Sequence, residues 1–297
     1  MEAASHSQVA IPLTVIVVSF NTRELNQTTN MNGYAGNQLS LLSQAGYFSS
    51  PVSPAGLPAF ARAADSNYSL EYRVRSYLSE NCVQCHQPGG AGAPTWDARP
   101  WLSMAQTHLI NGTLDNNGGD PLNKLVVPGD VNHSVLLRRV AANGFSRMPP
   151  LATHQLDPGA ISLLTQWINT ELTNRQDFAQ WQVAYFGSTN NPSAAANADP
   201  DSDGANNYYE FLTMTSPLTN SPTWKIYISS SGTNVNVNYL QLANRGFVVE
   251  QSGNLSTWSP WDVAGNQLGF GASNRWVSVS GPLLSSPQFF RVRISEP

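Results

Sequence analysis

The chain contains two cysteines, and both belong to one short motif. They stand as Cys82-Val83-Gln84-Cys85, and His86 follows directly. This C-x-x-C-H pattern is typical of covalent haem attachment of the c type. Two thiols three residues apart can form thioethers to the two vinyl groups of one porphyrin edge, and the next imidazole can then bind the iron. We therefore predict a haem c attached to Cys82 and Cys85, with His86 as an axial ligand.

A haem that transfers electrons needs a sixth ligand, and a methionine thioether raises its potential relative to a second histidine. Met148 is the predicted ligand because it stands in Arg147-Met148-Pro149-Pro150, where two prolines stiffen the backbone. Arg138 or Arg139 could face a haem propionate by charge. The alternative sixth ligands are three histidines, His108, His133 and His154.

Other chemistries remain open for the cysteine motif. The two thiols could form a disulfide or a redox pair, although thioredoxin-like sites need a βαβ context that the surrounding pattern does not show. A structural zinc ion normally needs four ligands, and the chain has no second cysteine pair. If Met148 does not bind, the iron would keep an open position, as in peroxidases.

A second motif lies in an acidic segment. Asp199-Pro200-Asp201-Ser202-Asp203-Gly204, continuing to Glu210, fits D-x-D-x-D-G-x5-E, the twelve-residue calcium loop. Carboxylates at positions 1, 3 and 5 and a bidentate glutamate at position 12 can surround one ion, and the glycine permits the sharp turn. The alternative is a solvated acidic linker. The predicted calcium ligands are Asp199, Asp201, Asp203, the backbone carbonyl of Ala205, Asn207 and Glu210.

Hydrophobic spacing predicts two helices around the cysteine motif. Leu70, Val74, Tyr77 and Leu78 share one helical face that leads into Cys82. A second helix begins at Asp157-Pro158, where an N-cap residue precedes a proline, and carries its apolar face through to Leu172. A short helix is expected around residues 134–140.

Four segments follow from these patterns. Residues 1–65 form an irregular N-terminal segment with a strand-like start at residues 14–19, residues 66–176 a haem domain, residues 177–222 a linker with the calcium loop, and residues 223–297 a small β-sandwich domain. The last segment has short runs rich in Val, Ile, Phe, Tyr and Trp, separated by Gly, Asn, Ser and Pro. Its tryptophans Trp258, Trp261 and Trp276 would either fill a small core or form a carbohydrate-stacking face.

The charge and hydrophobicity of the chain argue against some classes of function. A net charge of −4 and a pI near 5.7 leave no basic stripe for phosphates, so we expect no nucleic-acid partner. No apolar run approaches the roughly 20 residues that span a bilayer. A secretory signal is poorly supported at residues 1–20, yet c-type haem attachment takes place outside the cytoplasm. We therefore expect a periplasmic or extracellular location, and a chain that either is the C-terminal part of a longer exported polypeptide or has a misassigned start.

The segment from about Leu70 to Leu172 resembles a class I c-type cytochrome domain, with the attachment motif near its start, the Met148-Pro149-Pro150 loop and Trp167 in its final helix. With Val126-Val127-Pro128-Gly129-Asp130 it is similar to haem domains at the C-termini of large exported bacterial proteins, which often carry a quinoprotein sugar dehydrogenase domain. Residues 178–222 resemble a thrombospondin type 3 calcium repeat. The resemblance implies a multidomain fold, an all-α cytochrome c domain plus a C-terminal all-β sandwich-like domain.

These observations predict an electron-transfer module rather than an enzyme. The haem would accept electrons from an exported dehydrogenase, either a separate redox partner protein or a dehydrogenase fused to this chain. The alternative function is a secreted calcium-binding structural or adhesion module without haem, in which Cys82 and Cys85 form a disulfide.

Overall fold

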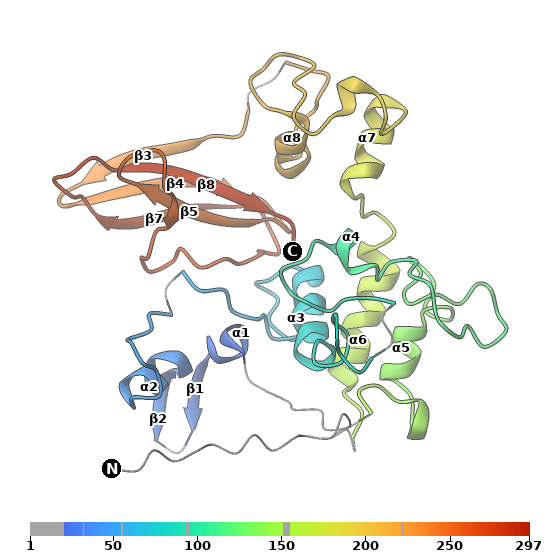
Figure 1. Ribbon diagram of the computed structural model, residues 1–297. Helices are drawn as coiled ribbons and strands as arrows, with labels where there is room; N and C mark the ends of the chain where they lie inside the picture. The colour runs from blue at the N-terminus through green and yellow to red at the C-terminus, as the bar shows by residue number, and fades with distance from the viewer. Residues whose placement is uncertain (1–20, 32, 55, 93–94, 151–154, 221–222) are drawn as a thin grey trace, which may run out of the picture.

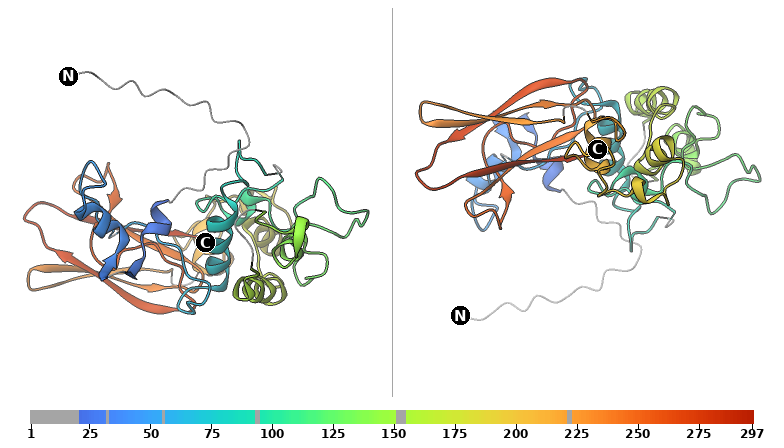
Figure 2. Two further views of the ribbon diagram at one scale, coloured as in Figure 1. Left: turned by 90° about the horizontal axis from the view of Figure 1, so that it is seen from below. Right: turned by 90° about the horizontal axis from the view of Figure 1, so that it is seen from above.

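The structure is a computed structural model, and it describes residues 21–31, 33–54, 56–92, 95–150, 155–220 and 223–297. The strand expected at residues 14–19 and the alternative ligand His154 lie outside these residues. Helices α3, α5 and α6 lie on one side of the molecule, and two β-sheets lie on the other (Figure 1). Helices α7 and α8 lie between these two parts in the sequence and beside both in space (Figures 1 and 2).

The N-terminal segment is a small folded unit held by side-chain amides. It contains α1 (Thr22–Leu25), the antiparallel strands β1 (Thr28–Met31) and β2 (Tyr34–Asn37), and α2 (Gln38–Gln44). Asn37 caps α2, and the buried Asn26 donates to the carbonyl oxygen of Leu57 at 2.8 Å. Asparagine favours such caps and turns because its side chain bonds to nearby backbone. The Asn-rich composition therefore marks an ordered segment here.

Two long helical segments form the larger core, as the hydrophobic spacing predicted. Helix α3 (Leu70–Cys82) begins at Ser69, whose hydroxyl accepts from the backbone N–H of Tyr72 at 3.2 Å. Helix α6 (Pro158–Gln166) begins at Asp157, whose carboxylate accepts from the N–H of Ala160 at 3.0 Å, and continues as the π-helical turn η2 (Trp167–Glu171). Their facing side chains are fully buried, among them Val74, Leu164, Trp167 and Ile168.

The chain between these helices carries short elements within long loops. Helix α4 (Met104–Thr107) is followed by α5 (Val135–Val140), where a short helix was expected, and by the 3-10 turn η1 (Gly144–Ser146). Isolated parallel bridges join Ile110 to Val126 and Lys124 to Ser134. Leu109, Leu125 and Val126 extend into the core of α3 and α6, so this loop region belongs to the same packed unit.

The segment predicted as a linker contains two packed helices. Helix α7 (Phe178–Phe186) begins with a capping box between Asp177 and Gln180, and α8 (Asn207–Thr213) follows the 3-10 turn η3 (Pro192–Ala194). Trp181 of α7 is buried against Phe211 and Leu212 of α8. The acidic loop lies directly before α8 and is therefore held by this small core.

The C-terminal strands form two three-stranded antiparallel sheets. One has the order β3 (Ile226–Ser231), β4 (Asn234–Gln241) and β7 (Arg275–Pro282). The other has the order β6 (Ser259–Pro260), β5 (Gly246–Ser252) and β8 (Phe289–Ser295). The alternating side chains that face inward share one core, formed mainly by Val235, Val237, Tyr239, Phe247, Val249, Trp261 and Val279.

The predicted fold class is wrong. The described residues contain eight α-helices and eight strands along one chain, and a two-stranded sheet precedes α3, so an all-α domain followed by an all-β domain does not describe the chain. The β part also packs directly on α3. The N–H of Ser69 donates to the carbonyl oxygen of Phe270 at 2.8 Å, and the Phe270 ring lies 4.6 Å from that of Tyr72. The chain is a mixed α and β structure.

Within the described part of the chain, no helix has the length and apolar character needed to cross a membrane.

The contact between Phe270 and α3 predicts joint unfolding of the helices and sheets. Phe270→Ala should lower the free energy of unfolding by about 3 to 5 kcal/mol, because it leaves a cavity beside the buried Tyr72. Denaturant unfolding followed by far-UV circular dichroism and by tryptophan fluorescence should give one shifted transition for both signals. Phe145→Ala, on a fully exposed ring, should change stability by less than about 0.5 kcal/mol. Two separate transitions in the wild type would contradict the joint unit.

Candidate functional site

The cysteine motif lies at the point where α3 ends. Cys82 is the last residue of the helix, and Cys85 and His86 lie in the turn that follows. Their backbone N–H groups donate to the carbonyl oxygen of Cys82, at 3.1 Å from Cys85 and 2.8 Å from His86. The motif therefore forms a compact turn whose position is set by the packing of α3, and only its first cysteine is helical.

The loop after the motif holds the imidazole of His86. The N–H of Gly92 donates to the carbonyl oxygen of Cys85 at 2.9 Å, which folds the loop back under the motif. A Cβ atom at Gly92 would lie only 2.9 Å from Nδ1 of His86, so this close approach requires glycine. The buried Trp96 ring stacks on the imidazole, with ring centroids 4.8 Å apart. The ring of His86 is thus held by close contacts with Trp96 and with the glycine loop.

An apolar cavity brings three of the predicted haem residues together. Its volume is about 240 Å³, and Cys82, His86 and Met148 all line it. Met148 comes from a later segment of the chain, after α5 and η1. Ligand pockets are typically lined by apolar side chains with a few polar groups. The remaining lining residues fit this description: Thr95, Trp96, Leu114, Asp115, Asn116, Leu125, Val135, Leu136, Arg139 and Val140.

Backbone contacts place Met148 at this cavity. Its N–H donates to the carbonyl oxygen of Arg139 at 3.0 Å, which ties the Met148 loop to the end of α5. Arg139 Nε donates to the carbonyl oxygen of Ser146 at 3.2 Å, and its side chain lines the cavity. Arg138 instead donates to Oδ1 of the buried Asn123 and to the carbonyl oxygen of Asn132. Of the two arginines, only Arg139 is placed to meet an anionic group in the cavity.

The other sulfur and imidazole groups lie elsewhere among the described residues. Met104 is buried in the helical core, and Met214 is exposed after α8. His108 lines a separate cleft of about 760 Å³ beside α4, and His133 pairs with Asp130. Neither histidine lines the cavity around Cys82, so Met148 is the described residue best placed to oppose His86.

The thiol of Cys82 is unsuited to thiol–disulfide exchange. Burial, with a smaller contribution from Cys85, raises its pKa to about 12, although the residue keeps some accessible surface. Redox-active C-x-x-C pairs need a lowered thiol pKa, because the thiolate is the reactive form. The two cysteines are free thiols in the structure. The buried, weakly acidic thiol of Cys82 therefore argues against redox cycling.

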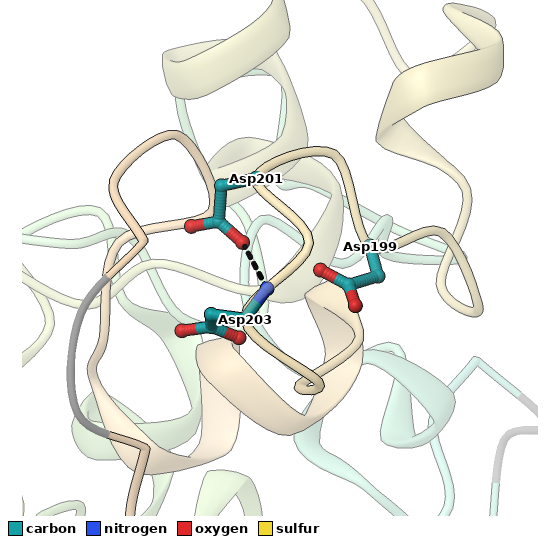
Figure 3. A group of neighbouring side chains, drawn as sticks. All are labelled: Asp199, Asp201 and Asp203. Carbon is teal, nitrogen blue, oxygen red and sulfur yellow. Dashed lines mark hydrogen bonds between the residues drawn. The ribbon is translucent and has the colours of Figure 1, made fainter.

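The acidic loop places three carboxylates around one point. Asp199, Asp201 and Asp203 each offer an oxygen, and these oxygens lie within 4.8 Å of one another. Figure 3 shows the side chains gathered inside the loop, with the N–H of Asp203 donating to Oδ1 of Asp201 at 3.3 Å. Gly204 has a φ of +93°, so the predicted glycine provides the sharp turn. Three converging carboxylates repel one another unless a cation lies between them.

Several buried oxygens around the loop have no hydrogen-bond partner among the described residues. Oδ2 of Asp201, Oδ2 of Asp203 and Oε2 of Glu210 are three of them. Oδ1 of Asn207 is a fourth. The amide nitrogen of Asn207 donates to the carbonyl oxygens of Ser193 and Ala195, which orients the side chain. Buried polar groups without partners are rare and costly, and an ion is one explanation for them. Ala205, the predicted backbone ligand, is also buried in this loop.

The carboxyl group of Glu210 responds to the same crowding. Burial, together with the smaller effect of the nearby charges of Asp201, Asp203 and Asp199, raises its pKa from 4.5 to about 7. Its Oε1 accepts from the hydroxyl of Thr215 at 3.5 Å, which lowers the pKa only in part. A calcium ion between these groups would favour the ionised form instead.

The comparisons with known proteins find no matching family model, curated protein or solved structure. The assignment of this chain to the class I c-type cytochromes, with a following thrombospondin type 3-like repeat, is therefore wrong: no family model supports it, and the fold is mixed rather than all-α. The roles considered for Cys82, Cys85, His86 and Met148 rest on their own chemistry and geometry.

The pKa of Glu210 predicts a pH dependence that calcium reverses. Because the folded pKa of about 7 exceeds the ordinary 4.5, the calcium-free protein should lose stability as pH rises through this window. Glu210→Gln should then be more stable than the wild type in chelator at pH 8, but less stable than the wild type in excess calcium. Thermal unfolding from pH 4.5 to 8 measures both differences.

Glu171→Gln is the matched control for this experiment. Burial also raises the pKa of Glu171 to about 7, but this residue lies at the end of η2 and outside the acidic loop. Its substitution should have the same effect with and without calcium. If Glu210→Gln behaved like Glu171→Gln, the loop would not bind the ion through Glu210.

Proposed function

We propose that this protein carries a haem c attached to Cys82 and Cys85, with His86 and Met148 as axial ligands, and that it transfers single electrons. The observation that carries this proposal is the shared apolar cavity: the thiol and imidazole of one motif and a thioether from a distant segment of the chain line one space. These are the groups that covalent attachment and iron ligation need. The C-x-x-C-H motif supplies the second thiol, on Cys85.

The residues of the chain would position and shield the haem. Trp96 and the Gly92 loop hold the imidazole of His86 in one orientation, and the Arg139 carbonyl holds the backbone of Met148. The apolar walls exclude water, which favours the less charged reduced state of an iron centre. Arg139 offers a positive charge to a propionate. When bound, the haem supplies a one-electron couple, and no proton or substrate group needs to move.

The cavity is small for a whole macrocycle, at about 240 Å³, so one haem edge would stay exposed for a partner. We propose a redox partner protein, or a dehydrogenase fused to this chain, as the electron donor. Because thioether attachment to haem takes place outside the cytoplasm, the proposal includes a periplasmic or extracellular location.

The axial ligand proposed here predicts the behaviour of two matched methionine variants. The protein should be produced in a host with exported haem-attachment machinery and examined by a pyridine haemochrome assay and ferric spectra. Met148→Leu should remove the weak far-red ferric band of sulfur ligation and allow rapid carbon monoxide binding to the reduced form. Met104→Leu, in the buried core, should leave both properties unchanged.

The same experiment separates the alternatives. Cys82→Ala together with Cys85→Ala should give protein without covalent haem. A colourless wild-type protein would overturn the proposal. Rapid carbon monoxide binding by the wild type would show an open iron site instead, as in a peroxidase.

A calcium-binding structural module is the second candidate function, and the unpartnered oxygens of the acidic loop favour it. It is compatible with haem, because the loop lies between α7 and α8 and away from the cysteine motif. Calcium would stiffen the connection between helices and sheets. Chelator should therefore increase protease cleavage near residue 200, and added calcium should protect the wild type but not Asp203→Asn. Equal cleavage with and without calcium would contradict the structural role.

A further inference from the structure

The sheet formed by β3, β4 and β7 buries one face and leaves the other uncovered. Residues of β4 alternate strictly, so Val235, Val237 and Tyr239 are buried while the residues between them point outward. The outward positions carry these side chains, here called the outer face: Tyr227, Ser229 and Ser231 of β3, Asn234, Asn236 and Asn238 of β4, and Trp276, Ser278, Ser280 and Pro282 of β7. Each of these side chains is uncharged, and the exposed Lys225 directly precedes β3.

Two aromatic rings lie side by side on the outer face. Tyr227 is 56% exposed and Trp276 is 66% exposed, and their ring centroids are 6.0 Å apart with the planes tilted by 53°. They come from β3 and β7, on either side of β4, where Tyr227 pairs with Asn238 and Trp276 with Leu240. Exposed neighbouring aromatics on a folded surface mark an interaction site more often than single ones do.

The polar groups beside these rings are amides and hydroxyls. Asn238 Nδ2 donates to the carbonyl oxygen of Tyr227 at 3.2 Å and to Oγ of Ser229 at 3.3 Å. These contacts fix the amide and leave its Oδ1 to accept from a ligand. Asn236, Ser278 and Ser280 continue the same neutral surface along the strands.

The sheet formed by β6, β5 and β8 carries charged side chains instead. Strand β8 carries Arg291 and Arg293, which pair with Glu250 of β5, and Arg291 also lies over the Trp258 ring at 4.5 Å. Trp261 is buried in the core. Of the three tryptophans considered from the sequence, only Trp276 therefore lies on a neutral, uncovered aromatic surface.

We propose that the outer face binds a soluble, neutral polysaccharide chain. The apolar C–H faces of sugar rings pack on aromatic rings, and sugar hydroxyls bond to neutral amides and hydroxyls, so the outer face offers both contacts without charge. A neutral surface gives no electrostatic attraction to acidic polymers. Since the two rings are tilted by 53° rather than coplanar, they suit a flexible chain better than a flat crystalline surface. This proposal is independent of the haem.

Affinity gel electrophoresis of the full chain tests the proposal. The gels contain hydroxyethyl cellulose, soluble xylan, soluble mannan or, as the acidic polymer, polygalacturonate. At least one neutral polymer should retard the wild type, and polygalacturonate should not. Trp276→Ala and Tyr227→Ala should each weaken binding to that polymer at least tenfold. Trp101→Ala is the matched control, because Trp101 is 65% exposed but lies in the loop before α4.

Several outcomes of this experiment would contradict polysaccharide binding at the outer face. The proposal is overturned if no neutral polymer retards the wild type, if Trp276→Ala binds as well as the wild type, or if Trp101→Ala weakens binding equally. Sedimentation velocity is run on the same samples. A dimer that Trp276→Ala converts to monomer would make the outer face an interface between copies, and would also overturn it. Haem-free protein, from Cys82→Ala with Cys85→Ala, should bind the polymer normally.

Discussion

The buried carboxylate of Glu71, in the first turn of α3, links this helix to the segment after η2 and to the β-sheets. Arg175 Nε donates to its two oxygens at 3.1 and 3.2 Å, and Asn244 Nδ2 donates at 3.1 Å. These partners come from the segment after η2 and from the turn between β4 and β5. A buried charge is stable only when it is paired and hydrogen-bonded, so α3 keeps its place only if both segments keep theirs. Because α3 ends at Cys82, the motif inherits this constraint.

Local signals in the sequence predicted many elements. Asp157-Pro158 marked the start of α6, the apolar spacing from Leu70 marked α3, and β-rich runs marked β3, β4, β5, β7 and β8. Cap chemistry and side-chain periodicity act within one element, so they can be recognised without a fold. The spacing of the acidic loop was equally local, and the structure brings Asp199, Asp201 and Asp203 together.

Contacts between distant segments could not be predicted in this way. Nothing near Phe270 indicates that it packs on Tyr72, and nothing near Glu71 indicates Arg175, so two separate domains were expected where the helices and sheets are packed together. Helix α7 was not predicted, because its Asp177–Gln180 capping box stands in a polar stretch that resembles a linker. The Gly92 contact with His86 was also missed, although a glycine-rich run after the motif was its visible signal.

The position of the Cys82 cavity has a consequence for how the protein is made. Every residue that lines this cavity lies between residues 82 and 148, so none of its walls comes from the strands of residues 226–295. The sheets instead contact α3 at its other end, around Ser69 and Tyr72. If thioethers form at Cys82 and Cys85, the segment that encloses them is synthesised before the sheets, and attachment would not have to wait for the sheets to dock.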